Sequence, residues 1–357
     1  MEQRRKNLTQ LFIPICLETL LYMLSGMVDT LMLSSVNDQA VGAVGTANTY
    51  IGIFIIMFSV ISSGMVAVMT QNIGAGRPGV AYQARQLGLT FNAVLGIIVS
   101  LILTFGAGAI LAGVGVADAL MQPARTYLQI VGGFCILNAL IPICSSYLRA
   151  FGFSKEPLYA SIIGNVINFC LNAFFLFVLH KGVAGVATAT VISRIINLVI
   201  VVLLGAVLVK AKQHPERESN RAVMGQIIRI GLPSACETAI YNVSMTLVIR
   251  FLNQMDAQGL NVTARSYTMQ ITNFSYCVGA ALAQANAIMT GWHIGAKEYD
   301  ACDRGTKKAA VIGVIVAVIL ETVFTLCSGW IMQLFSKDPQ MVSLVGKLLA
   351  IDIVLEI

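Results

Sequence analysis

Two carboxylates inside a long apolar stretch are the first residues that could do chemistry. Glu18 and Asp29 lie within residues 9–34, which are long and apolar enough to cross a bilayer as one helix. With Tyr22 and Ser25 they fall four, three and four residues apart, so all four side chains share one side of a helix. A charge inside a membrane costs at least about 2.5 kcal/mol. We therefore expect this polar stripe to face other helices or a wet cavity.

A second set of polar side chains lies in a later apolar stretch. Asn165, Asn168 and Asn172 are spaced at i, i+3 and i+7, which places their amides on one helix face. Such amides either join helices by hydrogen bonds or offer oxygens to a cation, and the spacing leaves both interpretations open. Thr190, in the next apolar segment, could add a hydroxyl, and Arg194 is a candidate partner for Asp29.

The composition is that of a membrane protein. Hydrophobic residues make up 57% of the 357 residues, charged residues only 11%, and the mean hydropathy is +0.80. Soluble domains carry about 25% charged residues, so a soluble fold is excluded. The eight cysteines are scattered and the three histidines are isolated, so we expect no metal centre, disulfide framework or cofactor. The net charge of +6 follows the loops, so no nucleic-acid partner is expected.

The apolar segments predict an all-α polytopic membrane protein. We expect spans near 9–34, 46–70, 86–113, 126–148, 158–180, 183–209, 227–252, 262–290 and 307–334, and a tenth beginning near 341. Sixteen Lys and Arg residues fall on one side of this topology and six on the other, which predicts a cytoplasmic N-terminus in the inner or plasma membrane. A polar linker at 210–225 follows six spans and separates an N-terminal lobe, 1–209, from a C-terminal lobe, 226–357.

The chain also contains an internal repeat. The pattern that begins at Pro14 and includes Glu18 and Tyr22 returns at Pro233 with Glu237 and Tyr241, shifted by 219 positions. An even number of spans separates the copies, so the repeat is parallel, an arrangement associated with transporters. Two matching lobes would contain 12 spans, whereas the sequence supplies about 9.5. We therefore expect the second lobe to be truncated. Asp29 has no counterpart, because Val248 stands at the equivalent position.

The order and spacing of several short motifs resemble the multidrug and toxic compound extrusion (MATE) family of cation-coupled transporters. These motifs are Pro14 with Val28-Asp29-Thr30, Gln71 with Gly74-Ala75-Gly76, Arg149-Ala-Phe-Gly152, the asparagines 165, 168 and 172, and Gly182 with Gly185. The resemblance implies two six-helix lobes around a central cavity that opens alternately to either side. It also implies efflux of organic cations against entry of protons or sodium.

The resemblance assigns roles to the polar residues. Asp29 aligns with the first-span aspartate that the family uses to bind a cation or proton, and one branch has a second aspartate at the position of Asn172. An amide cannot titrate, which excludes a proton switch built on these two positions. The predicted coupling set, with a possible Na+ site in its first four members, is Asp29, Asn168, Asn172, Thr190 and Glu18. The predicted substrate cavity contains Glu237, Tyr22, Tyr241 and Asn165.

We therefore predict a multi-pass secondary antiporter that exports drugs and other organic cations in exchange for Na+ or H+. Small organic cations and the lipid bilayer are its expected partners, and we expect a monomer. An enzyme is not expected, because the sequence has neither a P-loop nor a catalytic cluster at the end of a span. Two alternatives remain: a flippase for a lipid-linked precursor, from a related branch of the superfamily, and a nonfunctional truncated transporter.

Overall fold

The computed structural model describes residues 6–34, 38–113, 116, 118–209, 216–255, 260–333 and 339–355, and every regular element in these ranges is a helix. The first group, called here the N-terminal group, consists of α1 (Leu8–Ser34), α2 (Asp38–Gly74), α3 (Pro78–Gly113), α4 (Asp118–Gly133), α5 (Ile136–Ala150), α6 (Lys155–Ala173), the π-helical turn η1 (Phe174–Val178) and α7 (Gly182–Leu208). The C-terminal group consists of α8 (Asn220–Met255), α9 (Leu260–Gly295), α10 (Tyr299–Leu326), α11 (Ser328–Met332) and α12 (Pro339–Leu355).

The helices confirm the predicted all-α polytopic membrane fold. Six helices among the described residues are long and apolar enough to cross a bilayer, and the bent pair α4 and α5 can form a seventh span. Sequence analysis predicted one continuous helix over 126–148, whereas the structure bends the chain by 43° between Gly133 and Ile136. Glycines precede the bend, and the backbone N–H of Ile136 donates to Ser100 Oγ at 3.2 Å, which satisfies a group that the break releases.

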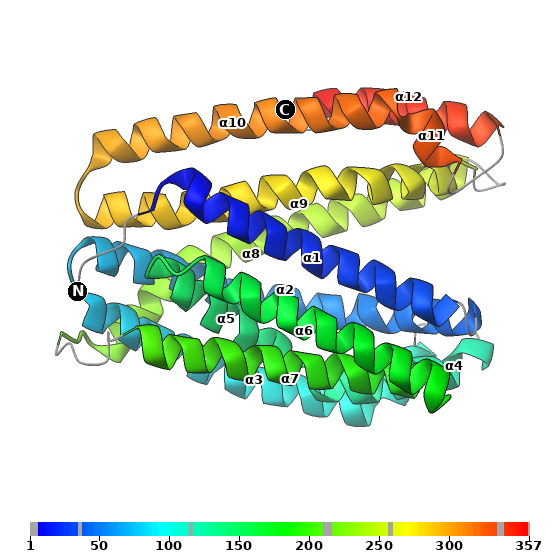
Figure 1. Cartoon of the computed structure of the whole chain (residues 1–357), viewed down its shortest axis with the longest axis horizontal. Coiled ribbons are helices and arrows are strands. Elements are labelled where there is room, and N and C mark those ends of the chain that lie inside the picture. The colour runs from blue at the N-terminus through cyan, green and yellow to red at the C-terminus, as the bar shows by residue number, and fades with distance from the viewer. Residues whose placement is uncertain are drawn as a thin grey trace.

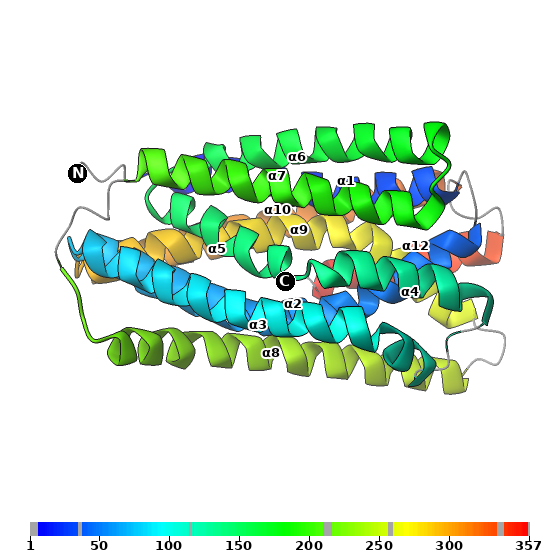
Figure 2. The ribbon, with the colours of Figure 1, turned by 90° about the horizontal axis from the view of Figure 1, so that it is seen from below.

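The helices run along the long axis of the molecule in two groups (Figure 1). In this view α9 and α10 lie on one side, α3 and α7 lie on the other, and α1 and α8 pass between them. Figure 2 shows α8 at one edge beside α3, and α6 and α7 at the opposite edge. The contacts agree with these views, because α1 packs against both α6 and α9, and α8 packs along α2.

One end of the bundle, called here the basic end, carries the start of α1 and the turns between α2 and α3, α5 and α6, and α9 and α10 (Figure 1). The segment before α8 is fixed there. Arg77 pairs with Glu218 at 2.6 Å, and the Gln83 side chain exchanges hydrogen bonds with the backbone of Glu218. Residues 210–215 of the predicted linker lie outside the described residues, and α8 already begins at Asn220. The predicted lobe boundaries themselves stay a prediction.

Glycines allow α2 and α8 to cross at very close range. A Cβ atom on Gly64 would collide with the carbonyl oxygen of Ile227, and one on Gly231 would collide with that of Val60. Small residues of this kind are common where membrane helices pack, because they let two backbones approach. This crossing joins the two groups toward the basic end.

A second crossing, between α2 and α9, uses the sequence Ile-Gly-Ala, which occurs as Ile73-Gly74-Ala75 and returns as Ile294-Gly295-Ala296, 221 positions further on. A Cβ atom on Gly74 would meet the carbonyl oxygen of Trp292, and one on Gly295 would meet that of Gln71. Each glycine therefore faces the residue three positions before the other glycine, as a local two-fold relation requires. The sequence repeat thus has a physical counterpart: equivalent segments of the two groups pack against each other.

We predict that Gly64→Ala lowers the apparent melting temperature of the purified protein, because the added methyl group must push α2 and α8 apart. Overpacking of this kind costs about 1–3 kcal/mol. The control is Gly52→Ala on the same helix, where a Cβ atom meets no other residue within 4 Å. This substitution should leave the melting temperature unchanged or raise it slightly, since alanine favours a helix over glycine by about 1 kcal/mol. Equal melting temperatures for the two variants would contradict the close crossing.

Candidate functional site

A short chain of hydrogen bonds joins Asp29 on α1 to two asparagines on α6. Asn172 Nδ2 donates to Asp29 Oδ1 at 2.6 Å and to Asn168 Oδ1 at 3.2 Å. Asn168 and Asn172 are buried, whereas Asp29 is half-buried. Asn172 Oδ1 is buried as well and has no hydrogen-bond partner among the described residues. The cluster thus combines a carboxylate with amide oxygens, one of which is available to a further donor or a cation.

Two other predicted polar residues near this cluster donate to backbone carbonyl groups. Thr190 is buried on α7, and its hydroxyl donates to the carbonyl oxygen of Val186 on the same helix at 2.9 Å. Asn165 donates to the carbonyl oxygen of Leu21 at 3.4 Å, which joins α6 to α1. The structure therefore brings Asp29, Asn168 and Asn172 together, and it uses Asn165 to fasten the two helices that carry them.

Arg194 supplies a positive charge near this cluster. Its charge acts on both Asp29 and Tyr127, a buried residue of α4. Arg194 Nη1 is buried and has no hydrogen-bond partner in the part of the chain that the structure describes. The sequence analysis named Arg194 as a candidate partner of Asp29, but it missed Tyr127, because one tyrosine in an apolar segment has no distinctive spacing.

Glu18 belongs to a different cluster, toward the basic end. One oxygen of its carboxylate accepts a hydrogen bond from Arg149 Nη2 at 2.5 Å, and the other accepts one from the Ser161 hydroxyl at 3.4 Å. The side chains of Arg149 and Glu18 are only 8% and 14% exposed. An arginine is charged at any physiological pH, so its burial at this site requires the carboxylate.

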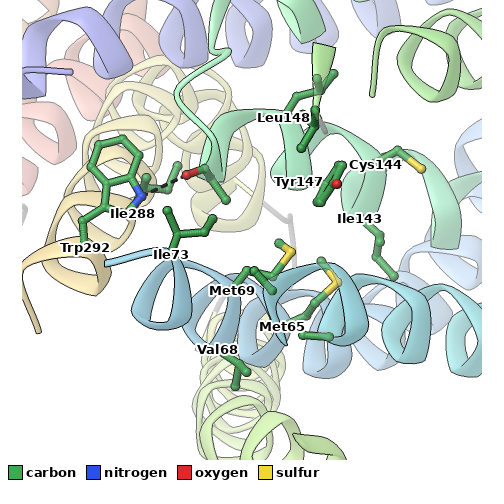
Figure 3. Close-up of a cluster of buried hydrophobic side chains, with 14 of the residues drawn as sticks. Met65, Val68, Met69, Ile73, Ile143, Cys144, Tyr147, Leu148, Ile288 and Trp292 are labelled. Carbon is green, nitrogen blue, oxygen red and sulfur yellow. Dashed lines mark hydrogen bonds between the residues drawn. The ribbon is translucent and has the colours of Figure 1, made fainter. Parts of the chain in front are cut away.

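The end of α5 places Arg149 between the two helical groups. Gly152 has φ 86° and donates to the carbonyl oxygen of Arg149 at 2.9 Å, which ends the helix. Arg149 Nη1 then donates to Gln284 Oε1 on α9 at 2.6 Å. Carbonyl groups in the last turn of a helix lack helical partners, and that of Ala150 accepts from Trp292 Nε1 at 2.9 Å (Figure 3). Sequence reasoning placed Arg149 in a motif but missed its partners, which lie 131 and 135 positions away.

Three residues of the predicted substrate cavity are solvent- or lipid-accessible in this structure. Tyr22 and Tyr241 are 64% and 54% exposed, and Glu237 is exposed too. The two members of the repeated glutamate pair therefore differ in environment, because the Glu18 side chain is largely covered where it pairs with Arg149. Their assignment to a substrate cavity stays a prediction.

An open groove of about 540 Å³ lies between α2 and α8 beyond their glycine crossing, away from the basic end. Its lining is almost entirely apolar and consists of Ile53, Ile56, Met57, Ala239, Asn242, Val243 and Leu247. Among the described residues, no three His, Cys, Asp or Glu side chains are grouped so that they could hold a metal ion.

We predict that Asn172→Leu destabilises the protein more than Asn165→Leu does. The first substitution leaves Asp29 Oδ1 and Asn168 Oδ1 without their donor, which costs about 1–3 kcal/mol. The second, on the same helix, removes only a long hydrogen bond. Thermal unfolding of the two purified variants measures the difference. Equal losses would mean that the Asp29 cluster contributes no more than an ordinary contact between helices.

Comparison with known proteins places the chain in a family. The family model MatE matches residues 14–174 and 233–357. The uncharacterized transporter YisQ of Bacillus subtilis is 32% identical over 349 residues, covering 96% of this chain and 76% of YisQ. The probable multidrug resistance protein NorM of Thermotoga maritima is 22% identical over 350 residues, covering 95% of this chain and 74% of NorM.

Solved structures share the fold. A structure of MATE in the straight conformation matches with a TM-score of 0.88 and 18% identity, over 98% of this chain and 79% of that one. An outward-facing multidrug resistance MATE family transporter matches with a TM-score of 0.83 and 20% identity, over 98% of this chain and 78% of that one. The resemblance predicted from the sequence motifs is confirmed: this chain belongs to the MatE family of multi-pass membrane transporters and is not an enzyme.

Proposed function

We propose that this protein is a secondary antiporter of the cell membrane that exports small organic cations in exchange for Na+ or H+. The observation that carries the proposal is the carboxylate of Asp29, which lies half-buried among the spanning helices and is held by Asn172. Family membership supports transport of small organic molecules. The name of the NorM relative, a probable multidrug resistance protein, supports drugs as the cargo of this chain.

The Asp29 cluster suits a small inorganic cation as the coupling ion. Asp29, Asn168 and Asn172 carry oxygens of the kind that hard cations prefer, and the buried Asn172 Oδ1 is available to one. If the ion is a proton, Asp29 must carry it, because neither asparagine titrates. Further ligation by Thr190 or Glu18 stays a prediction, and Glu18 would have to be shared with Arg149.

The space between the two groups suits the organic part of the cargo. The apolar lining of the open groove between α2 and α8 suits contact with a small lipophilic molecule. We propose that Tyr22, Tyr241, Glu237 and Asn165 line the path of the cargo. Aromatic rings and a carboxylate both attract organic cations, which favours this assignment.

We propose that the basic end lies in the cytoplasm, as the excess of Lys and Arg on that side of the chain indicates. The two groups would then be two lobes that meet on the cytoplasmic side. Similarity to a transporter solved in an outward-facing conformation supports this assignment. We expect the protein to act as a monomer in the bilayer.

Asp29→Asn should lower coupled export of a fluorescent organic cation such as rhodamine 123 by at least about tenfold, the effect of losing 1.4 kcal/mol of interaction with the coupling ion. Export is measured in inverted vesicles with an imposed Na+ or H+ gradient, and the gradient that drives it identifies the ion. The control is Asp303→Asn, which removes an exposed carboxylate paired with Lys307 at the surface. Equal export by the parent and Asp29→Asn would place coupling elsewhere.

A further inference from the structure

The two groups meet at the basic end through one shared hydrophobic cluster. Its fully buried members include Leu11 of α1, Met69 of α2, Tyr147 of α5 and Trp292 of α9. Figure 3 shows Met65, Met69 and Ile73 on one helix opposite Tyr147 and Leu148, with Trp292 beside them. This cluster and the two glycine crossings close the basic end. Alternating access therefore requires this interface to separate.

Two hydrogen bonds join the N-terminal group to α9 within this interface. Trp292 on α9 donates to the backbone of Ala150, and Arg149 donates to the amide oxygen of Gln284. Both hydrogen bonds join the groups through a neutral acceptor. The carboxylate that neutralises Arg149 comes from Glu18, which belongs to the same group as the arginine. The ion pair between Arg77 and Glu218 also joins the groups at this end, but its side chains are 49% and 30% exposed, so water screens it.

This distribution of charge decides how the interface can open. Separating an ion pair at low dielectric loses the Coulomb attraction between two opposite charges in addition to the hydrogen bond between them. Separating Arg149 from Gln284 leaves Arg149 neutralised by Glu18, so only a hydrogen bond to a neutral amide is lost. A carboxylate at position 284 would instead make an ion pair across the groups.

We propose that Glu18, Arg149 and Gln284 form a separable latch, whose charged half stays within the N-terminal group and whose neutral half breaks each time the basic end opens. The latch rests on the alternating-access function proposed above. Gln284 does not contact the cargo in this proposal. It affects transport only by changing how easily the interface opens. The neutral side chain at this position sets how readily the interface opens.

Trp292 is an intrinsic fluorescent probe for the opening of this interface. The sequence has two tryptophans; Trp292 is 2% exposed, and Trp330 is 71% exposed. In a Trp330→Phe background the remaining fluorescence comes from the basic-end interface. Iodide does not enter a bilayer, so in lipid nanodiscs it quenches Trp292 only when this interface opens.

In that background, Gln284→Leu should raise the iodide quenching constant by at least about twofold, because the open state gains population. Gln284→Glu should lower both the quenching and the export of rhodamine 123 by at least about twofold, because opening must now break an ion pair. The control is Gln129→Leu, which removes a glutamine that donates to the carbonyl oxygen of Thr104 within the N-terminal group, and it should leave quenching unchanged.

Unchanged quenching in both Gln284 variants would overturn the latch, as would equal effects of Gln284→Leu and Gln129→Leu. Quenching is measured without cargo or ion gradient, so it does not depend on the identity of either. If quenching responds as expected but the parent exports no organic cation, the latch stands and the proposed cargo is wrong. If export depends on Asp29 but the Gln284 variants quench like their parent, the antiporter proposal stands and the latch is wrong.

Discussion

A buried charge between helices in a bilayer must be neutralised by a neighbouring side chain, and this constraint organises both polar clusters of the protein. Arg149 is buried against Glu18, and Asp29 lies beside the amide of Asn172 and within reach of the charge of Arg194. Neither cluster can form from one helix. The contacts of α1 with α6 and α9 therefore serve the polar groups as well as the apolar core.

The two polar clusters lie at different heights along α1. Asp29 lies eleven residues beyond Glu18, which is about 16 Å along a helix. The Glu18 cluster reaches α9 in the other group through Arg149 and Gln284, whereas Asp29 accepts its hydrogen bond from Asn172 within its own group. One helix thus connects a site suited to a coupling ion with the interface that must open. This arrangement gives α1 a direct physical means to link the two events.

Much of the fold followed from the sequence, because long apolar segments and breakers leave few alternatives in a membrane. The repeat around Gly74 and Gly295 was visible too, and the structure places these glycines at a shared crossing. The face of Asn165, Asn168 and Asn172 was predicted from helical spacing, and two of them do meet Asp29. Local periodicity was sufficient to predict which side chains share a helix face. A repeated motif was sufficient to predict which segments are equivalent.

Contacts between distant segments could not be predicted in this way. Nothing local to Glu18 indicates that Arg149 is its partner, and Gln284 stands in an apolar segment like many other polar residues. Trp292 is similar, since its partner is the backbone carbonyl of Ala150, which has no helical partner because α5 ends there. The bend between α4 and α5 was missed because apolar composition continues through it. In each case the deciding contact is tertiary.

Transport by the proposed mechanism requires the two groups to separate at the basic end and to close again. The most direct test is the distance between two spin labels, each carried by a modified phenylalanine. One label replaces Tyr159 on α6 and the other replaces Tyr299 on α10, and both positions are exposed near this end. Double electron–electron resonance should give two distance populations, whose ratio changes when the coupling ion or an organic cation is added. A single distance that no ion or cargo alters would contradict the account.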